Sequence, residues 1–171
     1  IPGANLVKHH ADCEYPFRQD SNFWYLTGFD EPDAIALFLS HKPKGERFIM
    51  FVAPKDVMNE VWNGFRWGLE GAEKEFNADK AHSIKELRDL LPAYINGSDE
   101  LVFSIGKHPL IEKLVLEIFS QQLDNRSRLG FGANSIKSPE IYLNEMRLIK
   151  SEFEIKRMRE AIQISAEAHE L

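Results

Sequence analysis

Two apolar runs, at residues 34–39 and, after Arg47, through residue 53, constrain the fold of this chain most strongly. They are separated by residues 42–45, where Pro43 and Gly45 favour a turn. Each run has the length of a strand, so the pair predicts a hairpin. The runs are apolar at successive positions rather than at every second one, so both faces of the strands are expected to be buried. The sequence therefore predicts a sheet that is covered on both sides.

Helical patterns alternate with these runs. Ser83 and Ser151 each precede a glutamate by three residues, which is the capping-box signature of a helix start. Pro109 suits a first helical position, and apolar residues repeat at helical spacing from Leu110 to Leu123. Further segments are a third strand at residues 101–105 and short helices after Asp56, at residues 72–76 and after Pro139. Strands alternating with helices predict an α/β fold with a mixed sheet.

Residues 15–33 place six aromatic side chains around Arg18, Gln19 and Asp20. We expect Ser21 to cap a short helix and Gly28 to end it in the left-handed conformation. Aromatic side chains bury large areas, so residue types alone indicate a structural plug at this position.

Composition limits the classes of function. The 171 residues are 43% hydrophobic and 28% charged, which is ordinary for a globular domain. The net charge of −6 argues against a nucleic-acid partner. The single cysteine, Cys13, excludes an internal disulfide and is typical of a reducing compartment. No apolar run reaches the length of a membrane span, so we expect no membrane partner.

Residue types alone do not define an active site. The six histidines are scattered and form no zinc motif. Asp30, Glu31 and Asp33 could hold a hard cation, although a solvated turn is the simpler interpretation. Three glycines at residues 64–71 allow close backbone approach but match no phosphate-binding loop. The polar, Gly-containing segment at residues 124–134 is expected to be a loop.

The order of the residues is more specific than their types. Residues 15–33, YPFRQDSNFWYLTGFDEPD, closely resemble the signature of the amino-terminal domain of aminopeptidase P, in the creatinase/prolidase (M24) family of metallopeptidases. Residues 60–72 resemble the family's E-x-W-x-G-x-R-x-G-x-x-x-A, and Asn-Ala-Asp at residues 77–79 lies where the family often has Gly-Val/Ala-Asp. Residues 144–151 resemble H-E-M-R-L-x-K-S, with Asn144 where histidine is common, and an E-E-I-x-x-M-R-x-A helix follows.

The resemblance implies a creatinase-type amino-terminal α/β domain whose mixed β-sheet is flanked by helices on both faces. We expect this domain at residues 1–134, a linker at residues 135–150, and the first helix of a truncated "pita-bread" catalytic domain at residues 151–171. The family's catalytic domain holds two divalent metals, typically manganese, through two Asp, one His and two Glu. All five ligands would lie beyond Leu171, so we expect no catalytic residue and no metal in this chain.

The ends of the chain agree with that expectation. It begins at Ile1 without a methionine, and it stops at Leu171 inside a helical pattern that no Gly, Asn or Pro ends. We therefore expect an inactive fragment whose partner is its own missing catalytic domain.

In oligomeric family members, this domain covers the mouth of a neighbouring subunit's active site. The resemblance therefore implies a homo-oligomer that acts on peptides. Trp62 matches an aromatic position that faces the mouth, and a basic residue from the Arg126/Arg128 segment, assigned here to Arg126, is a second candidate for substrate binding. A core or rim tryptophan is the alternative for Trp62.

Three functional hypotheses remain open at this point. The first is the amino-terminal piece of a cytoplasmic Xaa-Pro aminopeptidase, which removes the first residue from peptides with proline second. The second keeps the fold in a prolidase or creatinase relative, or in a catalytically dead homologue that binds peptides or proteins. The third is an unrelated nucleotide or nucleic-acid module on a similar sheet.

Overall fold

The computed structural model describes residues 1–170 and, except at Asn59, their side chains. Leu171, the last residue of the expected final helix, lies outside the described residues. Contacts divide the chain into two compact units, Ile1–Ser138 and Pro139–Leu171, and each is described by itself.

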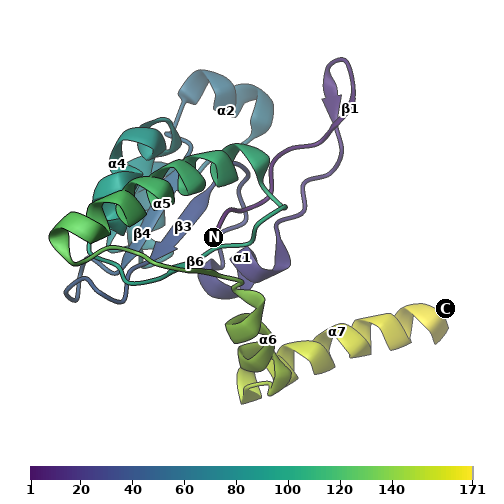
Figure 1. The fold of residues 1–171 in the computed structure, drawn as a ribbon. Coiled ribbons are helices and arrows are strands. Elements are labelled where there is room, and N and C mark those ends of the chain that lie inside the picture. Colours follow the sequence, from purple (N-terminus) through teal and green to yellow (C-terminus); the bar gives the residue numbers. More distant parts are fainter. Residues whose placement is uncertain (171) are drawn as a thin grey trace. The chain divides into compact units, whose positions relative to one another are not determined.

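A three-stranded mixed sheet forms the centre of the first unit (Figure 1). Strands β3 (Ile35–Phe38) and β4 (Phe48–Val52) pair antiparallel, with Ile35 opposite Phe51. Strand β5 (Lys80–Ser83) adds to the other edge of β4 in parallel, with Ala81 opposite Met50. The hairpin and the mixed sheet predicted from the sequence are therefore confirmed.

Both faces of the sheet are buried against helices. Ile49 and Phe51 belong to a core cluster with residues of α4 (Leu87–Ile95) and α5 (Pro109–Leu129). Met50 and Val52 belong to a second cluster, which includes Phe23 of α1 (Ser21–Thr27) and Ala72 of α3 (Gly68–Lys74). Successive residues of a strand point to opposite faces, so the continuous apolar run in β4 serves both cores.

Shorter elements complete the first unit. They are the antiparallel pair β1 (Lys8–His10) and β2 (Cys13–Glu14), helix α2 (Val57–Asn63), the 3₁₀ turn η1 (Ile84–Glu86), and the parallel pair β6 (Leu101–Val102) and β7 (Ile136–Lys137). The strand predicted at residues 101–105 is thus only two residues long and lies outside the central sheet. Ser83 and Glu86 form the predicted capping box.

Two predicted boundaries were wrong. The helix expected at residues 72–76 is α3, which begins earlier, at Gly68. The segment expected as a loop from residue 124 continues helix α5 to Leu129, where Gly130 ends it with φ 77°. Basic residues in the last turn favour this extension because they interact well with the negative end of the helix dipole.

The second unit contains helices α6 (Glu140–Leu148) and α7 (Glu152–Glu170). The Ser151 hydroxyl accepts from the Glu154 backbone N–H at 3.3 Å, and the Glu154 carboxylate accepts from the Ser151 N–H at 2.7 Å. This is the predicted second capping box. No described residue of α7 is buried, and its apolar residues Phe153, Met158 and Ile162 are exposed. Within residues 1–170, no helix is both long and apolar enough to span a membrane.

Candidate functional site

The Gln19 side chain joins backbone groups of the aromatic stretch, residues 15–33, to the amino-terminal segment. Its side-chain oxygen accepts from the backbone N–H of Ala4 at 2.6 Å and of Asp20 at 2.9 Å. Its side-chain nitrogen donates to the carbonyl of Phe29 at 3.2 Å and of Glu31 at 2.8 Å. The amide therefore fixes the turn after α1 against the amino-terminal segment.

The N-cap of helix α1 lies one residue before the position that the sequence predicted. Asp20, not Ser21, is the N-cap, and its carboxylate accepts from the N–H groups of Asn22 and Phe23, each at 2.9 Å. A carboxylate is a strong cap because it also interacts with the positive end of the helix dipole. Gly28 ends the helix with φ 69°, as predicted.

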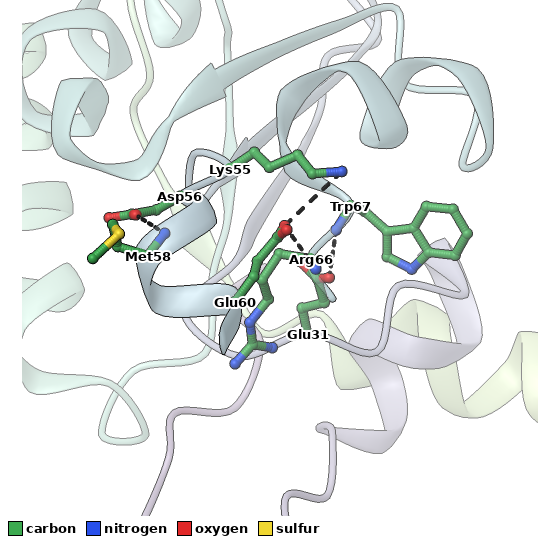
Figure 2. A network of polar contacts seen from close by, with 7 residues as sticks. All are labelled: Glu31, Lys55, Asp56, Met58, Glu60, Arg66 and Trp67. Carbon is green, nitrogen blue, oxygen red and sulfur yellow. Dashed lines mark hydrogen bonds and ion pairs between the residues drawn. The ribbon is translucent and has the colours of Figure 1, made fainter. Parts of the chain in front are cut away.

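Glu31 is a buried carboxylate that holds the segment between α2 and α3 (Figure 2). The residue is only 6% exposed, and Oε1 accepts from the Trp67 backbone N–H at 2.7 Å. Glu60 of α2 accepts from the backbone N–H of Arg66, the residue before Trp67, at 3.2 Å. The simple interpretation of the acidic cluster as a solvated turn was therefore wrong for Glu31, because the side chain is an internal acceptor.

The second oxygen of Glu31 has no partner. Oε2 is buried and makes no hydrogen bond with any described residue. Burial raises the pKa of Glu31 above its ordinary value, and the charges of Asp30 and Glu60 act in the same direction. The Trp67 hydrogen bond and the positive charge of Arg66 oppose that rise. Figure 2 shows the Arg66 guanidinium turned away from the Glu31 carboxylate.

The glycines of this segment allow close packing, as the sequence indicated. Gly68 has φ 64°, and a Cβ at that position would lie 3.1 Å from the Lys55 Cβ. Gly64 also has a positive φ of 78°, but a Cβ there would meet no atom within 4 Å. Gly68 therefore serves both backbone conformation and contact, whereas Gly64 serves conformation alone.

A cavity of about 270 Å³ lies over the Glu31 side of this network. Its polar lining comes from Glu31, Asp33, Asp56, Asn63 and Arg66. Its apolar lining comes from Leu6, Pro32, Ala53 and Pro54. The volume corresponds to a group the size of one side chain, since pockets for larger ligands are several hundred Å³.

The two predicted substrate-binding residues lie apart. Trp62 is on α2 and is 86% exposed, so it is not a core tryptophan. Arg126 is in the last turn of α5, and its guanidinium donates to the Gly132 carbonyl. Figure 1 shows α2 well separated from the carboxyl end of α5. The chain therefore does not bring these two side chains to one site.

No metal centre can be assembled from the part of the chain that the structure describes. There, no three His, Cys, Asp or Glu side chains are grouped closely enough to hold a metal ion. Glu31, Asp33 and Asp56 line one cavity without forming such a group.

Residues 1–103 match the family model described as "Aminopeptidase P, N-terminal domain". This chain belongs to the aminopeptidase P N-terminal domain family. The resemblance read from the sequence motifs is thus confirmed, together with the α/β fold class that it implied. Residues 15–33 and 60–72, which carry the clearest motifs, are also the segments joined by the Glu31–Trp67 hydrogen bond.

Relatives of this aminopeptidase P domain are longer proteins. The Xaa-Pro aminopeptidase of Haemophilus influenzae is 41% identical over 165 residues, which are 95% of this chain and 35% of that protein. The Escherichia coli Xaa-Pro aminopeptidase is 32% identical over 170 residues, 99% of this chain and 38% of that protein. The structure of Pseudomonas aeruginosa aminopeptidase PepP matches with a TM-score of 0.88 and 32% identity, over 99% of this chain and 38% of that one. The chain therefore spans little more than a third of these relatives.

Sequence reasoning missed the part that Glu31 plays in the fold of this chain. Glu31 and Trp67 are 36 residues apart, and no local pattern predicts a hydrogen bond over that separation. The available signal was the joint occurrence of the G-F-D-E-P and W-x-G-x-R-x-G motifs in one chain.

Proposed function

We propose that this chain is the amino-terminal, substrate-access and oligomerisation domain of a dinuclear-metal Xaa-Pro aminopeptidase. Such an enzyme releases the amino-terminal residue from peptides with proline second. One observation carries the proposal: nearly the whole chain aligns with little more than a third of proteins named Xaa-Pro aminopeptidase. One matching structure is that of zinc-substituted E. coli aminopeptidase P in complex with product.

The hydrolytic chemistry belongs to residues beyond this chain. We place two divalent metal ions there, with manganese as the expected metal, where they would activate a water molecule for attack on the peptide carbonyl. The described residues hold no group suited to a metal ion, so we assign no catalytic step to them. The 171-residue chain alone is expected to be inactive.

The domain boundaries follow from the same proposal. Residues 1–134 form the amino-terminal domain, and residues 151–171 begin the catalytic domain. Residues 135–150 are the linker between the two domains. The exposed apolar residues of α7 support this assignment, because an amphipathic helix buries its apolar side against another element. The catalytic domain is the proposed partner of α7, and the single cysteine supports a cytoplasmic location.

Trp62 is the proposed contact with peptide substrate, at the active-site mouth of a neighbouring subunit in a homo-oligomer. Its exposure supports this role, since a tryptophan that is 86% exposed contributes little to the core of its own domain. Aromatic side chains are common at binding surfaces because they offer large contact area with few rotatable bonds. Arg126 is the second proposed contact, although its guanidinium already donates to Gly132.

Substitution of Trp62 in the full-length protein tests this role. We expect Trp62→Ala to raise KM for peptides longer than three residues by about tenfold while leaving metal content unchanged. Trp24→Ala is the matched control, because Trp24 is also exposed, at 58%, but lies on α1. Unchanged kinetics in a stable Trp62→Ala protein would remove the assignment.

Arg126 is tested by comparison with Arg128, which lies on the same helix turn. If Arg126 binds peptide, Arg126→Ala raises KM and Arg128→Ala does not. A loss of stability without a change in KM would assign Arg126 solely to the end of α5, where it donates to Gly132.

A further inference from the structure

Helix α2, which carries Trp62, is an exposed helix. Among the residues of α2 whose side chains the structure describes, Glu60 alone is not exposed. A helix of seven residues is too short to be stable in water by itself, because isolated helices need roughly 12–15 residues. The position of α2 therefore depends on the contacts of Glu60 and of the segments on either side of the helix.

Glu60 joins the two segments that flank α2 (Figure 2). Its side chain is 18% exposed, and Oε1 accepts from the backbone N–H of Arg66, after the helix, at 3.2 Å. The same oxygen lies 3.9 Å from Nζ of Lys55, before the helix. The Lys55 ammonium also lies 4.5 Å from the centre of the Phe65 ring, which is a cation–π contact. These contacts hold the residues before α2 and the residues after it together.

Glu31 connects the segment after α2 to the core of the domain. Its Oε1 accepts from the Trp67 backbone N–H at 2.7 Å. The Trp67 ring packs edge to face against Phe76, with 5.4 Å between ring centres, and Phe76 packs in the same way against Phe29, at 4.9 Å. Phe29 is fully buried. A continuous set of contacts therefore runs from the core to the segment that Glu60 binds.

We propose that Glu60 is a positioning residue for Trp62, because its contacts with Arg66 and Lys55 fix the orientation of α2. Residues two apart on a helix lie on different sides, so Glu60 can face the domain while Trp62, at 86% exposed, faces outward. The inference rests on the proposed function, in which Trp62 contacts peptide substrate. Glu60 itself touches no substrate and acts through α2.

Amide relaxation in the 171-residue chain tests the anchoring of α2 without requiring hydrolysis. In the wild type we expect backbone order parameters of about 0.85 at Val61 and Trp62, which are typical of a rigid backbone. Glu60→Ala should lower them to below about 0.6 and leave those of α4 unchanged. Alanine favours a helix more than glutamate does, so the loss of order would come from the missing contacts. Unchanged order parameters in α2 of Glu60→Ala would overturn the proposal.

Three further variants define the contact. Glu60→Gln keeps an oxygen for the Arg66 N–H and should retain most of the order in α2. Glu70→Ala removes an exposed carboxylate from α3 and should behave as the wild type does. Lys55→Met serves in case Glu60→Ala does not fold; it removes the ammonium beside Glu60 and should lower the α2 order parameters by a smaller amount. Unchanged values in Lys55→Met would then contradict the proposal.

Kinetics of the full-length protein test whether the position of Trp62 matters for peptide. Glu60→Ala should raise KM about fivefold for peptides longer than three residues and leave kcat unchanged, since it weakens binding without touching the reacting atoms. If Glu60 acts through Trp62, Glu60→Ala combined with Trp62→Ala should have the KM of Trp62→Ala alone. A KM that rises by the product of the two single effects would show independent action and overturn the proposal.

The positioning role and the proposed peptide contact can fail separately. An unchanged KM in Trp62→Ala would contradict the peptide contact, and the relaxation measurement then decides whether Glu60 anchors α2. A KM that is raised in Trp62→Ala and unchanged in Glu60→Ala would overturn the positioning role and leave the peptide contact standing.

Discussion

The Gln19 side chain makes four hydrogen bonds to backbone groups. Both ends of its amide are used, by two donors and two acceptors that belong to the backbone of Ala4, Asp20, Phe29 and Glu31. These backbone groups lie in segments without regular secondary structure. If the Gln19 side chain is removed, no hydrogen bond of a strand or helix takes the place of the bonds it makes. The glutamine in the family signature at residues 15–33 is therefore explained by the backbone groups that its side chain binds.

Gln19→Ala should lower the free energy of unfolding by about 2–4 kcal/mol, because it leaves several partly buried backbone groups without partners. Urea denaturation measures this change. Gln121→Ala, at an exposed position of α5, is the control and should change the value by less than about 0.5 kcal/mol. Equal effects of the two substitutions would show that Gln19 does not hold the turn.

Glu31 makes stability depend on pH. Because burial raises the pKa of Glu31, the folded protein binds this proton more tightly than the unfolded chain does. Between the ordinary and the raised pKa, the folded state is protonated and the unfolded state is not. This contribution to the free energy of unfolding therefore falls as pH rises through that window.

Glu31→Gln removes this titration. The free energy of unfolding of the variant minus that of the wild type should increase from about pH 4 to about pH 7. Urea denaturation across this range measures the difference, with Glu145→Gln at an exposed position of α6 as the control. A difference that stays constant, or decreases, would contradict the raised pKa.

At the scale of elements, the segment between α2 and α3 is held by backbone geometry as well as by carboxylates. Gly64 and Gly68 both have positive φ, but only Gly68 lies against Lys55. Gly64→Ala should therefore cost about 1–2 kcal/mol of stability through its backbone alone. Gly68→Ala should cost more than Gly64→Ala because it adds a contact with the Lys55 backbone. Thermal unfolding of the two variants measures the difference, and a smaller loss at Gly68 would contradict the contact.

Elements with strong local patterns could be predicted from the sequence. The β3–β4 hairpin, the capping boxes at Ser83 and Ser151, and the helix that begins at Pro109 each follow from neighbouring residues. Strand β5 was missed because Lys-Ala-His-Ser has one buried residue, Ala81, and no apolar run. Its position depends on parallel pairing with β4, which a local pattern does not contain.

The candidate site was less predictable than the fold. Trp62 could be singled out from its motif, but the cavity depends on residues from three parts of the chain: Leu6, residues 31–33 and residues 53–66. Glu31 looked like a surface acid because its neighbours Asp30 and Asp33 are acidic. Only the folded chain places the Trp67 N–H beside its carboxylate.

At the scale of the whole molecule, the two units differ in how many of their residues are buried. The first unit has an extensive buried core, and most residues of the second are exposed. The mixed sheet of Ile1–Ser138 is covered on both faces, whereas α7 in the second unit buries none of its described residues. This difference agrees with the proposal that the amino-terminal domain lies within the first unit. It also agrees with the proposal that α7 is completed by the catalytic domain of a longer protein.

The most direct test of that proposal measures hydrolysis of an Xaa-Pro peptide by two purified proteins, the 171-residue chain and the full-length protein, each supplied with manganese. Release of the amino-terminal residue is followed over time against a mock preparation. We predict turnover by the full-length protein and none above the mock level by the 171-residue chain. Turnover that scales with the concentration of the 171-residue chain, or its absence from an intact full-length protein, would contradict the account.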